Sequence, residues 1–155
     1  MSVHSAGILL YRFVQGRLQV MLVHPGGPFW AGRDEGAWSI PKGLAEENEA
    51  LFDAARREFR EETGFGIDGV FTALGEIRQA SGKIVHAWAV EGDLDAGRVH
   101  SNTFTLEWPR HSGRLREYPE VDRAQWFDMH EAETKITRGQ ARFLQRLLMR
   151  LKDVK

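Results

Sequence analysis

Cysteine is absent from this sequence of 155 residues. Its absence excludes disulfides, thiolate zinc sites and cysteine nucleophiles, and it is consistent with a cytoplasmic location. An excess of one charge is missing too, because 21 Lys and Arg residues stand against 22 Asp and Glu residues and leave a formal net charge of -1. A near-neutral chain offers no broad electrostatic surface for nucleic acid, so we do not expect a nucleic-acid partner.

Long apolar runs are also lacking. No run could span a bilayer, and residues 1–14 do not have the charged and then apolar order of a secretory signal, so we expect no membrane partner. The glycines between residues 24 and 36 do not form the phosphate-binding loop of ATPases, and the six histidines show no metal-ligand spacing. The length suits one domain over residues 1–155; nothing in the sequence sets an oligomeric state.

The hydrophobic pattern predicts a mixture of strands and helices. Strand-like runs occur at residues 5–13, 18–24, 70–78, 83–91, 103–108 and 124–127. A helix is expected at residues 47–63, where Gly64 would end it. The last helix has Leu144, Leu147, Leu148 and Leu151 on one face. Residues 24–36 and most of 93–118 read as loops. The order predicts an α/β fold, a mixed sheet with helices packed against it.

Three glutamates fall on the same side of the first predicted helix. At about 100° per residue, Glu62 and Glu61 lie at about 40° and -60° from Glu58. Ala54 and Ala55 lie in the same sector, so these carboxylates continue the packed side of the helix rather than its solvated side. Such a group repels itself and loses hydration unless a cation neutralises it. Oxygen ligands without His or Cys suit Mg²⁺ or Mn²⁺ rather than zinc.

The segment around this helix resembles the signature of the Nudix hydrolase family, G-x5-E-x7-R-E-U-x-E-E-x-G-U with U apolar. The fixed positions are filled by Gly43, Glu49, Arg57, Glu58, Glu61, Glu62 and Gly64. Phe59 and Phe65 take the apolar places, where the family more often has aliphatic residues. The resemblance implies the Nudix α/β/α sandwich. The lead-in from Trp38 to Gly43 is similar to the W-x-x-P-K-G entry of the diadenosine and diphosphoinositol polyphosphate branches.

The resemblance also implies a metal site and roles for its residues. Glu58, Glu61, Glu62 and the carbonyl of Gly43 would bind one or more Mg²⁺ ions. Arg57 would support catalysis by holding a carboxylate, with Glu49 as the expected partner. An ordinary i,i+4 pair with Glu61 is the alternative for Arg57.

A carboxylate must also take a proton from the attacking water. Family members differ in which one does so, and the candidates inside and outside the signature are Glu61 and Glu120. Glu120 stands six residues before Trp126, a spacing similar to the family's late loop glutamate. Glu107 is a second candidate outside the signature, and for both outer residues a plain loop carboxylate is the alternative.

Cationic and aromatic side chains supply the candidates for substrate binding. Lys42 stands next to the signature and could reach a phosphate chain. The basic loop at residues 110–116, with Arg114, could clamp the far phosphates, although a solvated loop is the more common explanation of such a segment. Tyr118, Trp30 and Phe29 could stack on a base or serve only in packing.

The resemblance implies Mg²⁺-dependent hydrolysis of a pyrophosphate bond in a nucleotide-like small molecule. The entry at residues 38–43 favours dinucleoside polyphosphates, with nucleoside triphosphates as the alternative. A binding module that keeps the fold without catalysis is a further alternative, and the complete set of glutamates argues against it. An RNA-decapping role is disfavoured by the near-neutral charge.

Overall fold

Two long strands at the start of the chain organise the fold. The structure, a computed structural model, describes residues 3–153. β1 (His4–Val14) and β2 (Arg17–Pro25) pair as an antiparallel hairpin through the second half of β1. The first half of β1 pairs instead with β3 (Lys42–Leu44), so that Gly43 lies opposite Ala6. Through this change of partner strand, the start of the glutamate-rich segment, β3, becomes part of the sheet.

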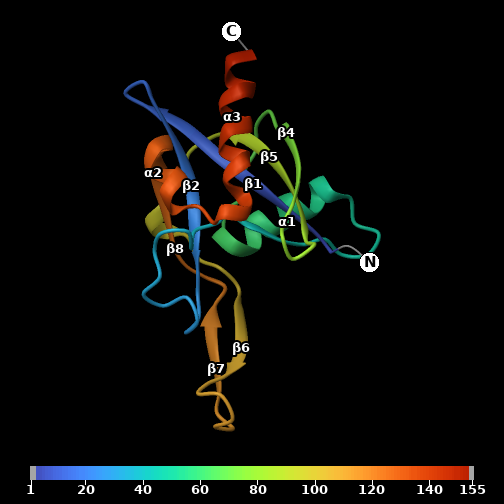
Figure 1. Cartoon of the computed structure of the whole chain (residues 1–155), viewed down its shortest axis with the longest axis vertical. Coiled ribbons are helices and arrows are strands. Elements are labelled where there is room, and N and C mark those ends of the chain that lie inside the picture. Colours follow the sequence, from blue (N-terminus) through green and yellow to red (C-terminus); the bar gives the residue numbers. More distant parts are fainter. Residues whose placement is uncertain (1–2, 154–155) are drawn as a thin grey trace.

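The sheet is mixed and is completed by three later strands. Its order is β4-β5-β1-β2-β8 (Figure 1), and β3 pairs with β1. β1 and β5 are parallel, and the other neighbours are antiparallel. The bounds of the later strands are Thr72–Arg78 for β4, Ile84–Glu91 for β5 and Val121–Asp128 for β8.

Helices cover both faces of this sheet. Successive residues of β1 point to opposite faces, so they contribute to two separate cores. Ile8 and Leu10 pack against α1 (Leu51–Thr63), whereas Leu9 packs in a second core with α3 (Ala141–Asp153). A short helix, α2 (Met129–Lys135), joins the second core. The expected α/β/α sandwich is therefore confirmed.

A narrow hairpin projects from the body of the molecule (Figure 1). It consists of β6 (Thr103–Glu107) and β7 (Leu115–Pro119), which pair only with each other. Two single turns of 3-10 helix complete the chain, η1 (Ala96–Arg98) and η2 (Arg138–Gln140). Within residues 3–153, no helix has the length and apolar character needed to cross a membrane.

The structure corrects several predicted boundaries. The first helix begins at Leu51 rather than at residue 47, because Asn48 has a φ of 64° and the chain turns before Ala50. The prediction that residues 93–118 form only one short strand was wrong, since β7 follows β6. β8 is longer than the predicted run at residues 124–127. The predicted end at Gly64 is confirmed, with a φ of 79° and a hydrogen bond of 2.8 Å from its N–H to the Arg60 carbonyl.

Candidate active site

The close approach of β3 and α1 brings Gly43 against Glu58. A Cβ added at Gly43 would overlap the Glu58 carboxylate, so any side chain at this position would have to displace that carboxylate. Glu58 is 8% exposed, and burial raises the pKa of its carboxyl group while Arg57 opposes that rise. The backbone of the sheet and a helix carboxylate therefore share one confined space.

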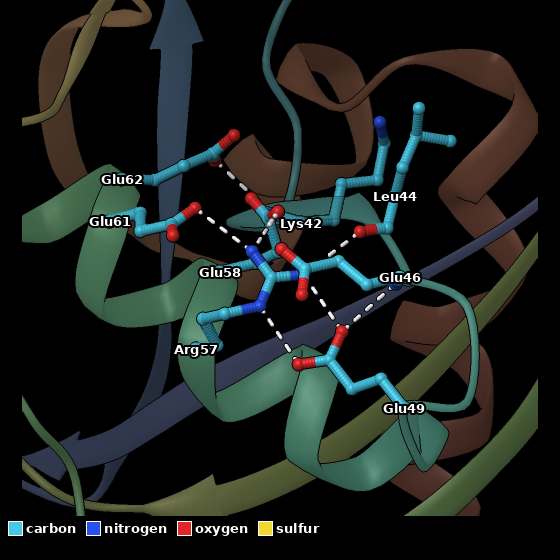
Figure 2. Close-up of polar contacts among 8 residues, drawn as sticks. All are labelled: Lys42, Leu44, Glu46, Glu49, Arg57, Glu58, Glu61 and Glu62. Carbon is cyan, nitrogen blue, oxygen red and sulfur yellow. Dashed lines mark hydrogen bonds and ion pairs between the residues drawn. The ribbon is translucent and has the colours of Figure 1, made fainter.

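Arg57 connects the loop before α1 to the glutamates on the helix (Figure 2). Its Nε and Nη2 donate to the two oxygens of Glu49 over 2.8 and 2.9 Å. Its Nη1 donates to Glu58 over 2.8 Å and to Glu61 over 3.1 Å, and Nη2 also donates to the Leu44 carbonyl. The two pairings considered for Arg57, with Glu49 and with Glu61, are thus both present. The contact with Arg57 lowers the pKa of Glu49 to about 2.

Glu62 faces the strand on the other side of this network. One of its carboxylate oxygens accepts a hydrogen bond of 3.1 Å from the backbone N–H of Lys42. Burial raises the pKa of Glu62 to about 8, although the charge of Lys42 acts in the opposite direction. Burial also lowers the pKa of the Lys42 ammonium group. A half-buried carboxylate and a half-buried lysine thus lie together at the start of β3.

Glu120 joins these glutamates from the far end of the chain. It stands between β7 and β8, where its N–H donates to the Asn102 carbonyl and its own carbonyl accepts from Gly26. The pKa of its carboxyl group is raised by burial and by the charge of Glu61. Its charge in turn raises the pKa values of Glu58 and Glu62. The structure therefore adds a fourth carboxylate to the three on α1.

These carboxylates fit a hard divalent cation by their chemistry. They supply only oxygen ligands, they repel one another, and the Glu58 carboxylate lies directly against the backbone of Gly43, in the space that a side chain there would fill. As the described side chains lie, no three His, Asp or Glu groups converge closely enough to hold an ion. Arg57 holds Glu58 and Glu61, and the Lys42 N–H holds Glu62. The oxygen ligands for a cation are therefore present, but Glu58, Glu61 and Glu62 are engaged in hydrogen bonds within the protein.

A pocket with a volume of about 240 Å³ opens beside these glutamates. Lys42, Glu62 and Glu120 lie on its wall, together with Trp30 from the loop after β2. A shallower hollow next to it is lined by Lys42, Gly43, Glu58, Glu62 and Glu120. Three of the four candidate metal ligands, Gly43, Glu58 and Glu62, therefore adjoin the pocket, whereas Glu61 lines a separate hollow beside Arg57 and Arg60.

The inner wall of the pocket contains polar residues that the sequence did not single out. Gln79 comes from the end of β4, and Thr137 and Gln140 come from the segment before α3. They belong to no motif and lie far from the glutamates in the sequence. Only the packing of α3 against β4 could have revealed them.

Other predicted site residues lie elsewhere. Arg114 stands next to β7 at the tip of the projecting hairpin and does not line the pocket. Tyr118 is in β7, where its ring lies 6.0 Å from that of Phe104. Glu107 accepts a hydrogen bond of 2.9 Å from the His111 N–H and so closes the hairpin's own turn. The structure brings Lys42 and Glu120 to the glutamates, but not these three residues.

Comparison with known proteins shows which family the chain resembles. A family model described as NUDIX domain matches residues 1–147. An RNA pyrophosphohydrolase of Caulobacter vibrioides is 46% identical over 50 residues, which are 29% of this chain and 29% of that protein. The chain thus matches less than a third of that relative's length.

Several solved structures resemble the whole fold. An Ap4A hydrolase of C. elegans in a binary complex has a TM-score of 0.66 at 21% identity, over 97% of this chain and 98% of that chain. The NUDIX domain of Shewanella oneidensis NrtR, complexed with ADP ribose, has a TM-score of 0.67 at 16% identity, over 97% of this chain and 89% of that one. At these identities the likeness concerns the fold.

Proposed function

The chain belongs to the Nudix family, and we propose that it hydrolyses the pyrophosphate linkage of a dinucleoside polyphosphate in a magnesium-dependent reaction. One observation carries the proposal: Lys42, Glu58, Glu62 and Glu120 line a single hollow that continues into the pocket. The hollow suits a phosphate chain with its metal ion, and the pocket suits one end of the substrate. We also propose that the protein is located in the cytoplasm.

The residues that would hold the ion are Glu58, Glu61, Glu62 and the carbonyl of Gly43. Bound Mg²⁺ offsets negative charge on the phosphoryl oxygens and makes a bound water more acidic. Arg57 keeps Glu58 and Glu61 side by side, because one nitrogen donates to both carboxylates. Its bidentate contact with Glu49 fixes the guanidinium plane.

Glu120 is our candidate for the general base. The other carboxylates of the cluster accept hydrogen bonds from Arg57 or from the Lys42 N–H. In the described part of the chain, the Glu120 side chain makes no hydrogen bond and faces the hollow. Water attacks a phosphorus atom, its proton passes to Glu120, and the P–O bond to the leaving nucleotide breaks. The products are two phosphate-terminated nucleotides.

Lys42 supplies a cation on the lining of the same hollow. Its ammonium group is partly buried beside Glu62 and lines both the pocket and the hollow. A phosphate oxygen entering the hollow would replace lost hydration with a charge-assisted hydrogen bond. Lys42 would therefore orient the phosphate chain rather than exchange a proton with it.

Removal of pyrophosphate from a triphosphate-ended RNA is a second candidate. The similarity to an RNA pyrophosphohydrolase over 50 residues favours it. The projecting hairpin also contains Arg110, Arg114 and Arg116, which could contact a longer phosphate backbone. The chemistry at the glutamates would be the same, and only the partner on the hairpin would differ.

A substrate screen tests the proposal. Diadenosine polyphosphates, nucleoside triphosphates, nucleotide sugars, diphosphoinositols and triphosphate-ended RNA are each incubated with the protein and Mg²⁺, and the products are separated. We expect the highest kcat/KM for a diadenosine polyphosphate, with two nucleotides as products. Faster release of pyrophosphate from a nucleoside triphosphate or from RNA would show that this compound, and not a dinucleoside polyphosphate, is the preferred substrate. No hydrolysis of any of them would leave a binding module.

A further inference from the structure

A buried histidine beside the pocket lies between two hydrogen-bond acceptors. His24, near the end of β2, is 2% exposed, and its neighbours Val23 and Pro25 line the pocket. The His24 Nδ1 lies 2.8 Å from Oδ1 of Asp122, and the His24 Nε2 lies 2.6 Å from the carbonyl oxygen of Arg33. Both distances are those of hydrogen bonds, so each ring nitrogen is paired with an oxygen atom.

The two partners together determine the charge of this ring. A neutral imidazole has one N–H and one lone pair, so it can donate to only one of two acceptors. The backbone carbonyl of Arg33 can only accept. The ionised carboxylate of an aspartate as exposed as Asp122, at 36%, can also only accept. The geometry is therefore that of an imidazolium, which donates from both nitrogens.

The two acceptors belong to different segments of the site. Asp122 is in β8, two residues after Glu120. Arg33 is in residues 26–36, which we call the Trp30 loop because Trp30 lines both the pocket and the hollow. The Arg33 N–H donates to the Trp30 carbonyl over 3.0 Å, so the two residues form one turn. The histidine therefore ties the Trp30 loop to β8.

The charged groups around His24 and the Trp38 ring that packs on it come from three elements. They are Asp122 and Arg123 in β8, Arg33 and Asp34 in the Trp30 loop, and Glu131 and Lys135 in α2. Asp34 accepts hydrogen bonds from Lys135 and from the Trp38 Nε1, and these bonds lower the pKa of its carboxyl group. Among these side-chain types, imidazole is the one that titrates between about pH 5 and about pH 8.

Loss of one proton from the ring must break one of the two contacts. The bond to Asp122 is charge-assisted, so the carboxylate favours a proton on the nitrogen that faces it. The proton that leaves is then the one on Nε2, and the Arg33 carbonyl loses its donor. We infer that His24 is a positioning residue, which holds the Trp30 loop at the pocket only while its ring is positively charged.

This inference goes beyond the proposed function, because the charge of His24 and the order of the Trp30 loop do not depend on any reaction. Its consequence for catalysis does rest on that function. Trp30 is part of the pocket wall, so release of the loop should weaken substrate binding. The candidate metal ligands are on β3 and α1 and are not tied to His24. Loss of the proton should therefore raise KM and leave kcat unaffected.

Nuclear magnetic resonance of the protein with isotope-labelled histidine measures the charge of the ring. At about pH 6 we expect both ring nitrogens of His24 to carry protons, and at higher pH a neutral ring with its proton on Nδ1. The resonances are assigned by their loss in His24→Gln. Hydrogen exchange of the Trp30 loop, corrected for the intrinsic rate at each pH, should become about tenfold or more faster as the ring loses its proton.

Asp122→Asn separates the titration from the structural role. The introduced amide can donate to Nδ1 of a neutral His24, whose Nε2–H then still donates to the Arg33 carbonyl. Exchange in the Trp30 loop should therefore stay slow in this variant at every pH, and KM for diadenosine tetraphosphate should stay low. In wild type, KM should rise by roughly threefold or more, relative to Asp122→Asn, between about pH 6 and about pH 8. The kcat ratio of the two proteins should stay constant.

His130→Gln, at an exposed position in α2, is the matched control and should follow wild type in every measurement. A neutral His24 ring at about pH 6 would overturn the inference. Loop exchange in wild type that ignores the titration would overturn it as well. So would a pH dependence in Asp122→Asn equal to that of wild type, a result that does not require His24→Gln to fold.

The outcomes also separate this inference from the proposed reaction. If no nucleotide is hydrolysed but the ring charge and the loop exchange change together, the proposed function fails and the role of His24 stands. If diadenosine tetraphosphate is hydrolysed but neither KM nor loop exchange follows the charge of His24, the inference fails and the proposed function stands.

Discussion

The carboxylate of Glu58 occupies the space in which a side chain at Gly43 would begin. One of these residues is in the middle of β3, and the other is in the second turn of α1. Their contact requires the strand to pass directly beneath the helix, which the pairing of Gly43 with Ala6 secures. Glycine at this position is therefore a condition for placing both a backbone carbonyl and a carboxylate at the candidate metal site.

Gly43→Ala should disrupt this arrangement without unfolding the protein. Alanine would displace the Glu58 carboxylate, and we expect Mg²⁺ affinity and kcat/KM to fall by roughly tenfold or more. Binding of Mn²⁺, followed by electron paramagnetic resonance, measures the affinity. Gly16→Asn, in an open turn where asparagine tolerates the backbone conformation, is the control. Equal losses in the two variants would mean that the space beside Glu58 has no special role.

The pair between Glu49 and Arg57 should make stability depend on pH in the acidic range. Folding lowers the pKa of Glu49 from 4.5 to about 2, so its ionised form stabilises the native state. This contribution is complete above the unfolded value and is lost as the pH falls from about 4.5 to about 2. Urea unfolding should show Glu49→Gln to be less stable than wild type at pH 7, with the difference shrinking below pH 4.5.

Glu47→Gln serves as the control for this pH dependence, because Glu47 is exposed and forms no ion pair with Arg57 in the described part of the chain. Its stability should parallel that of wild type at every pH. A constant difference between Glu49→Gln and wild type down to pH 2 would contradict the assigned ion pair.

The sequence predicted the parts of the site that depend on local periodicity. The helical repeat put Glu58, Glu61 and Glu62 in one sector with Ala54 and Ala55, and the structure shows both alanines buried. The α/β/α architecture and the family are likewise confirmed. The predicted start of the helix was wrong because Asn48 adopts a left-handed backbone conformation in the turn that leads into Glu49. The helical periodicity of the sequence does not reveal that turn.

Features that depend on packing between distant segments were missed. Gln79 and Thr137 meet only because α3 and η2 pack on the sheet beside β4. β7 was missed because Arg116 and Glu117 interrupt its apolar pattern, and its pairing with β6 defines it instead. For the basic loop at residues 110–116 the sequence left a phosphate clamp and a solvated loop open, and in the structure this segment forms the tip of that hairpin and the start of β7. Its role as a clamp stays a prediction.

Lys42 and Arg114 should therefore respond differently to substrate length. Lys42→Ala should lower kcat/KM for every phosphate chain, because the ammonium group lines the pocket wall. Arg114→Ala should have a measurable effect only on substrates that reach the hairpin, such as triphosphate-ended RNA. The comparison uses diadenosine tri-, tetra- and pentaphosphates together with RNA of increasing length. A loss in Arg114→Ala that matches Lys42→Ala on the shortest substrate would place the hairpin tip at the active site.

Glu120→Gln tests the source of the base. If Glu120 takes the proton, kcat should fall by roughly 10²-fold or more while KM changes little. High Mg²⁺ should not restore the rate, and the acidic limb of the pH–rate profile should disappear. Restoration by Mg²⁺ would make Glu120 a metal ligand instead. A kcat within about threefold of wild type would return the role to Glu61.

Hydrolysis of diadenosine tetraphosphate by wild type, Glu62→Gln and Glu47→Gln, at matched Mg²⁺ and after chelation, tests the central claim most directly. Product analysis should show two nucleotides from wild type and Glu47→Gln, and no turnover in either after the chelator is added. Glu62→Gln should retain its fold and lose roughly 10²-fold or more in kcat. Full activity in Glu62→Gln, or turnover that survives chelation, would contradict a magnesium site at these glutamates.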